Sequence, residues 1–523
     1  MNFKDFVLGN IPTPSKKEIE ADANRGDTEA MIALAGLYYD GCVVPRDCAE
    51  AEKWLTKAMK LGSANAASLL GLLYANGDFF PKDIEKAVVF LKKAADGGNV
   101  EAMNHLSEIY YFGDDIPQNY GEALRLSKRA ALAGSSEAQF NLGNMYAEGC
   151  GVKQNFPEAA RWWKMAAKNG NTKAMANIAS LYVHGDGVPA DIQEAVKWWK
   201  MAADGGDIEA MNALGAAYII GDDIPINLEE AKKWFNKAAE LNSVNAMRGL
   251  GAVFESVAET IEDEEGAKQN YTVSRRWYQK AAKLGDVTSM LRLAYVYYEG
   301  VGTRRNPRSA FRWYNEAAEA GDENAIFNMG ILWLNGEGTN PNSDIAAKWF
   351  EKSAKLGNTE AMVELGMIHI NSGKPRGASI ALQWWKKAAR NGNANAMHNL
   401  GVVYRKGEGV PQDYNTAINW YKKAIKNHSV SSMLGMADMY YNGEGVAQNK
   451  AEALKYLKKA AKEGDIEAMS RIAQMYLTGD GVKENMSLGI KWLAKIKENS
   501  YALPPQDVMM QDIKDFYAPE TVL

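Results

Sequence analysis

Glycine-rich loops are the segments of this 523-residue chain whose composition most resembles a site of chemistry. Two of them, Gly185–Val188 (GDGV) and Gly407–Val410 (GEGV), look like fragments of phosphate-binding motifs. Such motifs need a preceding strand and a GK[S/T] or GxGxxG context, whereas these loops recur between segments that we expect to be helical. Their acidic residues also lack the alternating ligand spacing of a calcium loop; they are Asp186, Glu408, Glu444 and Asp480. We therefore predict no bound cofactor and no metal.

Histidine, serine and cysteine patterns give no catalytic constellation. The histidines lie in five different parts of the chain and form neither HxxxH nor HExxH; they are His105, His184, His369, His398 and His428. There is no GxSxG motif, and no cysteine has an evident base beside it. We predict that the chain has no catalytic residues and is not an enzyme. The alternative is a repeat protein with hydrolytic or small-ligand-binding activity, which would require a deep polar pocket holding perturbed acid–base groups.

Composition restricts the class of protein further. The net charge is −5, which argues against a general nucleic-acid binder. The chain has no long apolar run, so we predict no membrane insertion. The N-terminal residues MNFKDFVLGNIPTPSKKE lack the apolar core of a secretory signal. Three cysteines (Cys42, Cys48 and Cys150) do not make a disulfide framework. We expect a cytoplasmic protein.

A repeat of about 36 residues organises the chain. Its anchor is a small residue that recurs thirteen times: Ala30, Ala66, Ala102, Ala138, Ala174, Ala210, Ala246, Ser289, Ala325, Ala361, Ala396, Ser432 and Ala468. An aliphatic residue follows four positions later, then Gly, Ala or Ser at position five and commonly an aromatic residue at position eight. Apolar residues at this three-four spacing form one helical face, and the small residue lets a neighbouring helix approach closely.

Each repeat also contains the signals for a second helix. An Asp or Asn closes the glycine loop and is placed to cap this second helix. The helix carries paired aromatic residues, such as Trp162/Trp163, Trp198/Trp199 and Trp384/Trp385. Their fixed phase with alanines three positions before and four after favours a core role over a ligand-stacking role. Most copies end in Gly, and Ser, Asn or Asp then caps the next first helix.

A helix pair of this size cannot bury its apolar stripe alone, so the repeats must stack. We divide the chain into an N-terminal segment (1–12), an N-terminal capping helix (13–26), thirteen repeats (27–500) and a C-terminal capping helix and tail (501–523). Within the tail, Gln506–Tyr517 is predicted to be a helix that covers the last repeat. The seventh repeat (243–285) has seven extra residues, which we place between its helices, and they include the acidic run Glu262–Glu265.

The pattern A-x-x-x-L-G-x-x-Y-x-x-G-x-G-V-x-x-D-x-x-x-A-x-x-W-x-x-K-A-A-x-x-G resembles the SEL-one-like repeat (SLR), a relative of the tetratricopeptide repeat; Ala138–Gly170 and Ala396–Lys426 match it closely. The resemblance implies an all-α fold, an α/α solenoid wound into a right-handed superhelix. It also implies a non-enzymatic scaffold or adaptor that binds other proteins or peptide segments. A cysteine-rich branch linked to β-lactam binding has paired cysteines in each repeat, which this chain lacks.

The resemblance further implies that the first helices line a concave groove, with non-core positions two, six and nine residues after the anchor. We call these positions the first-helix face. The residues predicted to bind protein there are Glu108, Tyr111, Phe140, Asn144, Arg248, Tyr295, Tyr298, Phe327, His398, Arg405, Asp438 and Tyr441. Two further features are left open. The acidic run Glu262–Glu265 would suit a basic partner or belong to a tolerated surface loop, and Glu520–Leu523 (ETVL) resembles a PDZ-binding C-terminus that arises easily by chance.

Overall fold

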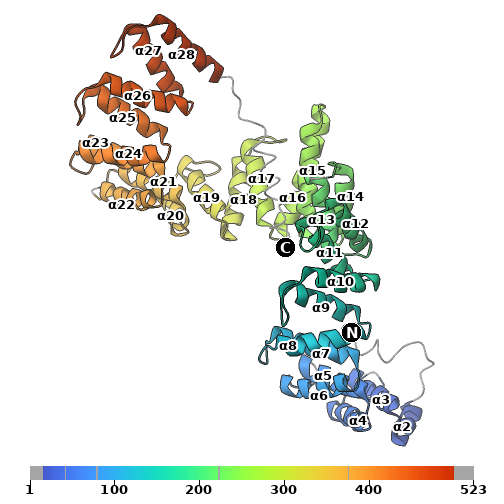
Figure 1. Cartoon of the computed structure of the whole chain (residues 1–523). Coiled ribbons are helices and arrows are strands. Elements are labelled where there is room, and N and C mark those ends of the chain that lie inside the picture. The colour runs from blue at the N-terminus through green and yellow to red at the C-terminus, as the bar shows by residue number, and fades with distance from the viewer. Residues whose placement is uncertain (1–15, 42, 78–79, 222–223, 375, 500–523) are drawn as a thin grey trace. The chain divides into compact units, whose positions relative to one another are not determined.

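The computed structural model describes residues 16–41, 43–77, 80–221, 224–374 and 376–499. These residues form 27 α-helices, α2 to α28, and no strand (Figure 1). The predicted all-α solenoid class is therefore confirmed. The chain divides into two units, Met1–Ser243 and Val244–Leu523, which we describe separately.

The first unit contains α2 (Lys16–Arg25) followed by six helix pairs. Within each pair the two helices pack against each other, and each second helix packs against the first helix of the next pair. The pairs are α3 (Thr28–Asp40) and α4 (Cys48–Lys60), α5 (Ala64–Asn76) and α6 (Ile84–Asp96), α7 (Val100–Phe112) and α8 (Tyr120–Leu132), α9 (Ser136–Glu148) and α10 (Phe156–Lys168), α11 (Thr172–His184) and α12 (Ile192–Asp204), and α13 (Ile208–Ile220) and α14 (Leu228–Glu240).

The second unit contains seven helix pairs packed in the same way. They are α15 (Val244–Thr260) and α16 (Glu264–Lys283), α17 (Val287–Glu299) and α18 (Pro307–Glu319), α19 (Glu323–Asn335) and α20 (Ser343–Lys355), α21 (Thr359–Asn371) and α22 (Gly377–Arg390), α23 (Ala394–Lys406) and α24 (Tyr414–Lys426), α25 (Val430–Asn442) and α26 (Lys450–Lys462), and α27 (Ile466–Thr478) and α28 (Met486–Asn499).

The fifth repeat shows how local signals set the helix ends. The Asn171 side chain accepts a hydrogen bond from the Ala174 amide at 2.9 Å and begins α11. Gly185 ends it in the left-handed region, at φ 76°, where glycine has no steric penalty. The Asp191 side chain then caps α12, and its amide donates to the carbonyl of Tyr182 at 2.8 Å. The predicted caps and stops therefore act as expected in this repeat.

The second loop glycine is a packing device. Gly187 has φ 70°, and a Cβ atom there would lie 2.7 Å from Phe156 Cβ and 2.8 Å from Pro157 Cδ. Both residues begin α10, the second helix of the preceding repeat. The absence of a side chain at Gly187 therefore allows the loop to pack closely against the start of that helix. This contact supports the interpretation of these loops as structural elements rather than phosphate sites.

The prediction that the extra residues of the seventh repeat form a loop is wrong. They lengthen both helices, because α15 has 17 residues and α16 has 20, against 13 in most others. Asp263 caps α16 by accepting from the Gly266 amide at 2.7 Å, and Glu264 and Glu265 occupy its first turn. Acidic side chains at that end are stabilised by the helix dipole, which gives the acidic run a local structural role.

The structure describes the N-terminal capping helix but not the predicted C-terminal one. The predicted N-terminal capping helix is present as α2, which starts at Lys16 and ends at Arg25. The predicted closing helix Gln506–Tyr517 and the motif Glu520–Leu523 lie outside the described residues.

Candidate interaction surface

The first-helix face is only partly accessible. Of its twelve predicted binding residues, Tyr295 is exposed, with 38% of its surface open to solvent, and the others are half-buried. Their burial arises from contacts between neighbouring repeats, which sequence spacing alone does not show.

Three position-nine residues contact the next repeat, at the end of its first helix or in the loop that follows. The Tyr111 hydroxyl donates to Glu148, and the Tyr441 hydroxyl donates to Asp480. Arg405 donates from Nε and Nη2 to the two carboxylate oxygens of Glu444, at 2.6 and 3.0 Å. The guanidinium holds the pKa of Glu444 below its ordinary value. These residues therefore join one repeat to the next.

Positions two and six make similar contacts. Arg248 lies 2.7 Å from the carboxylate of Asp286, the cap of α17. The Asn144 side-chain oxygen accepts from the Trp163 indole nitrogen at 3.0 Å and from Asn177 at 3.1 Å. Asp438 lies 2.6 Å from Arg471 in the following first helix.

Three aromatic residues of this face also contact neighbouring helices. His398 Nδ1 lies 3.0 Å from the Ser432 hydroxyl, and burial lowers the pKa of the imidazole. The ring of Phe327 lies 5.6 Å from that of Phe350, and the carbonyl of Phe140 accepts a hydrogen bond from an indole nitrogen. Most predicted residues thus have a place in the packing between repeats.

An aromatic and arginine patch lies on α17 and the loop after it, and it includes Tyr295, the exposed member of the twelve predicted residues. Tyr295 and Tyr298 lie one helical turn apart, so they share a side of the helix. The Arg292 guanidinium lies 5.1 Å from the Tyr295 ring, and that of Arg305 lies 5.1 Å from the Tyr298 ring. Arg305 also pairs with Glu337 at 2.9 Å. We call the two tyrosines and two arginines the α17 patch.

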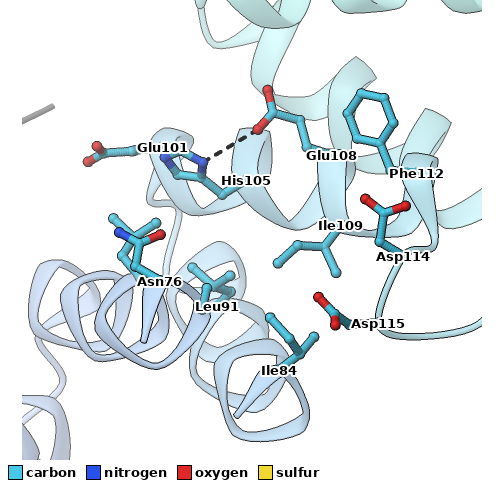
Figure 2. A pocket seen from close by; sticks show the side chains of 12 residues that line it. Asn76, Ile84, Leu91, Glu101, His105, Glu108, Ile109, Phe112, Asp114 and Asp115 are labelled. Atoms are coloured by element: carbon cyan, nitrogen blue, oxygen red, sulfur yellow. Dashed lines mark ion pairs between the residues drawn. The ribbon is translucent and has the colours of Figure 1, made fainter. Parts of the chain in front are cut away.

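A cavity of about 470 Å³ lies on the same face in the first unit. It forms between the C-terminal end of α5, α6 and α7, and Glu108 is the predicted binding residue that lines it (Figure 2). Its lining residues are Leu72, Ala75, Asn76, Ile84, Leu91, Glu101, His105, Glu108, Ile109, Phe112, Asp114 and Asp115. We call this the α7 cavity.

Charge in the α7 cavity is mainly negative. His105 Nδ1 lies 3.5 Å from Glu108, and this contact raises the pKa of the imidazole. Lys82 pairs with Asp115 at 2.7 Å. A second hollow of about 430 Å³ has the opposite character: Arg161, Lys164 and Lys168 of α10 line it.

A buried ion pair marks the lengthened seventh repeat. The Glu255 carboxylate is buried and accepts two hydrogen bonds from Arg292 Nε, at 3.2 and 3.0 Å, while Arg292 Nη2 lies 2.8 Å away. The hydroxyl of Tyr278 donates to the same carboxylate at 3.1 Å. Burial raises the pKa of nearby Glu259, and Glu255 adds to that shift. Because Glu255 belongs to α15 and Arg292 to α17, this ion pair links the seventh repeat to the eighth.

A family model described as the Sel1 repeat matches the chain thirteen times, over residues 28–63, 64–99, 100–135, 136–171, 172–207, 208–243, 245–286, 287–322, 324–358, 359–393, 394–429, 430–465 and 466–501. The chain belongs to the Sel1 repeat family. Proteins built from Sel1 repeats generally act as protein-interaction scaffolds and are generally not catalytic. Among curated proteins, none matches the chain significantly.

Solved structures support the Sel1 repeat fold. One is c5321, a protective antigen present in uropathogenic Escherichia coli strains and displaying an SLR fold: it is 24% identical, the match covers 98% of this chain and 96% of that one, and the TM-score is 0.64. Another is a Sel1 repeat protein from Oxalobacter formigenes, 26% identical over 59% of this chain and 88% of that one, with a TM-score of 0.50. No described helix combines the length and apolar character needed to cross a membrane.

Sequence reasoning missed most of the α7 cavity. It finds no catalytic or metal pattern at His105, and it gives no role to Glu101, Asp114 or Asp115. A signal was available, because only the third Sel1 repeat has a histidine three residues after the anchor. The contact that closes the cavity, between α5 and α7, is not visible in a single repeat.

Proposed function

We propose that this Sel1 repeat protein is a non-enzymatic scaffold that binds partner proteins through the first-helix face. The α17 patch is the observation that carries this proposal. Tyrosine and arginine are enriched among residues that dominate protein–protein binding. Here the two tyrosines and Arg292 lie on α17, Arg305 lies in the loop after it, and Tyr295 is open to solvent. The proposed setting is the cytoplasm, as the sequence predicts.

Side-chain stacking makes the patch a suitable anchor. A tyrosine already held beside a guanidinium loses less conformational freedom on binding than a freely moving side chain. Tyr295 and Tyr298 are both supported in this way. We make no proposal of hydrolytic activity, because the most buried carboxylate of the described residues, Glu255, is occupied by Arg292 and Tyr278.

The test compares the partners of matched variants of the full chain. Partners are cross-linked in cells, identified by mass spectrometry, and each is then assayed as a purified protein. We expect Tyr295→Ala combined with Tyr298→Ala to weaken at least one direct interaction by tenfold or more, as hot-spot truncations of about 2 kcal/mol do. Leu356→Ala is the control, since Leu356 is an exposed apolar residue at the end of α20.

A single variant separates binding from folding. Because Tyr298 is half-buried, its removal could disturb α17, whereas the exposed Tyr295 can be changed to Arg with little effect on stability. Loss of the same interaction in Tyr295→Arg, with an unchanged circular dichroism melt, supports the proposal. Full binding of every direct partner by both variants would refute it.

A further inference from the structure

The α7 cavity combines an apolar middle with acidic ends. Figure 2 shows Ile109 of α7 facing Ile84 and Leu91 of α6, with Glu101 and Glu108 toward one end and Asp114 and Asp115 toward the other. Phe112 adds an accessible ring at the rim, with 64% of its surface exposed. A cavity of this kind offers an apolar contact between two negatively charged ends.

Its negative charge is only partly neutralised by the protein. Lys82 pairs with Asp115, and His105 pairs with Glu108. Among the described residues, Glu101 and Asp114 have neither a hydrogen-bond nor an ion-pair partner for their side chains. One carboxylate therefore remains available at each end.

The third repeat differs from its siblings where these residues lie. Position six is acidic in only two repeats, as Glu108 and Asp438. Asp438 forms ion pairs with Arg471 and Arg405 of neighbouring first helices. Glu108 lines the cavity, and its ion-pair partner is His105. The sixth repeat shares the counterparts of Glu101 and of the Asp-Asp pair, as Glu209 and the sequence GDD at 221–223, so His105 and Glu108 are the residues that distinguish the third repeat from it.

We propose that the α7 cavity binds a basic segment of a partner protein, in which Lys or Arg residues flank one or two apolar residues. This inference rests on the proposed scaffold function and names the partner chemistry of one part of the first-helix face. The apolar side chains of the segment would contact Ile84, Ile109 and Phe112, while its cations would approach Glu101 at one end and Asp114 at the other.

The length of such a segment follows from helix geometry. Glu101 is in the first turn of α7, and Asp114 lies just beyond the other end of this helix. The helix has 13 residues and spans about 20 Å at 1.5 Å per residue. An extended peptide covers that distance with about six residues at about 3.3 Å each. The probe is therefore the hexapeptide Lys-Lys-Leu-Phe-Lys-Lys, acetylated, amidated and fluorescently labelled.

Binding of the probe to the full chain is measured by fluorescence anisotropy. We expect saturable binding that weakens as salt rises from about 50 to 150 mM, because salt screens exposed charges. A peptide with glutamates in place of the lysines, and one with serines in place of Leu-Phe, should both bind at least about tenfold more weakly.

Matched variants locate the site. Glu101→Gln with Asp114→Asn should weaken probe binding about tenfold. Glu209→Gln with Glu240→Gln is the control: it changes the net charge equally, and Glu209 stands in the same first-turn position of α13 as Glu101 does in α7. This control should change affinity less than about twofold.

The apolar contact is tested by substitutions at exposed residues, which should not disturb folding. Phe112→Ser should weaken the probe about fivefold, whereas Leu132→Ser, at an equally exposed site away from the cavity, should not. Equal loss in the charge variant and its control would overturn the proposal. So would competition by spermine together with an unaffected Phe112→Ser variant, which would indicate adsorption of any polycation.

The outcome for the α7 cavity is separable from that for the scaffold function. If the probe fails to bind while Tyr295→Arg still loses a direct partner, the basic-segment inference falls and the scaffold stands. If the probe fails and the α17 patch variants retain every partner, both fall. Probe binding that depends on Glu101, Asp114 and Phe112 supports the inference whatever the α17 patch does.

Discussion

Replacement of Gly215 by alanine should destabilise the sixth repeat, although alanine is the better helix former. A Cβ atom at Gly215 would lie 2.6 Å from Cε1, Cε2 and Cζ of Phe235, where carbon atoms normally keep about 3.5–4.0 Å. The Phe235 ring is fully buried, so it has little room to move. Overpacking of this kind costs about 3 kcal/mol at its upper end. The helix propensity of alanine offsets about 1 kcal/mol, which leaves a net loss of about 2 kcal/mol.

The assay must report on one repeat, because a long array does not unfold in a single cooperative step. Hydrogen exchange of peptides from α13 and α14, read by mass spectrometry, gives the local opening free energy. A loss of about 2 kcal/mol corresponds to exchange about 30-fold faster. Gly121→Ala is the control, since a Cβ atom there would contact only the Asn119 side chain, at 3.5 Å.

A second substitution tests the stated cause. Other repeats pair alanine at this position with leucine in the second helix, as in Ala35/Leu55 and Ala437/Leu457. Adding Phe235→Leu to Gly215→Ala should therefore recover about 1–2 kcal/mol relative to the sum of the single losses. The reasoning is refuted if Gly215→Ala exchanges no faster than the parent chain, or if the double variant loses as much as the two single variants together.

Three further predictions concern the second unit. Arg292→Met should cost about 3 kcal/mol, because it leaves the buried Glu255 carboxylate without its cation. Hydrogen exchange of α15 and α17 peptides should show most of the loss restored when Glu255→Leu is added. His398 has a pKa below its ordinary value, so the unfolded segment binds more protons below about pH 6.5. Hydrogen exchange of α23 peptides, corrected for the pH dependence of the intrinsic rate, should show local stability falling as pH drops through that window more in the parent chain than in His398→Gln. Leu493 is 46% exposed in the last described helix, and we expect removal of residues 501–523, proposed to cover it, to speed hydrogen exchange in α28.

The repeat period and the helix ends could be predicted because their signals are local. Asn171 and Asp191 cap helices a few residues away, and Gly185 supplies its own backbone conformation. In the seventh repeat the predicted helix ends are wrong. Comparison with shorter siblings assigns its extra residues to a loop, although Asp263 followed by Glu264 and Glu265 is itself a helix-start signal.

Contacts between repeats could not be predicted in the same way. The partner of Tyr111 is 37 residues away and that of Arg405 is 39 residues away, so neither pairing is contained in a single repeat. The position of a residue within its repeat shows which face of the helix it lies on, but the exposure of its side chain depends on contacts with the neighbouring repeat. The binding role of the first-helix face therefore remains a prediction, as do the cytoplasmic location and the role of Glu520–Leu523.

Positions shared by all thirteen repeats are fixed by packing, so selective binding must come from residues in which one repeat differs from the rest. The third repeat differs through His105 and Glu108, and the eighth through Tyr295 with Arg292 beside it. The first pair belongs to Met1–Ser243 and the second to Val244–Leu523. Because distant sites without shared contacts act independently, substitutions in the α7 cavity and the α17 patch should combine additively in free energy. A partner that binds both units at once would instead lose more binding free energy from whichever substitution is made first than from the one added to it. Bivalent binding depends on both contacts, so either substitution alone removes the bivalent advantage.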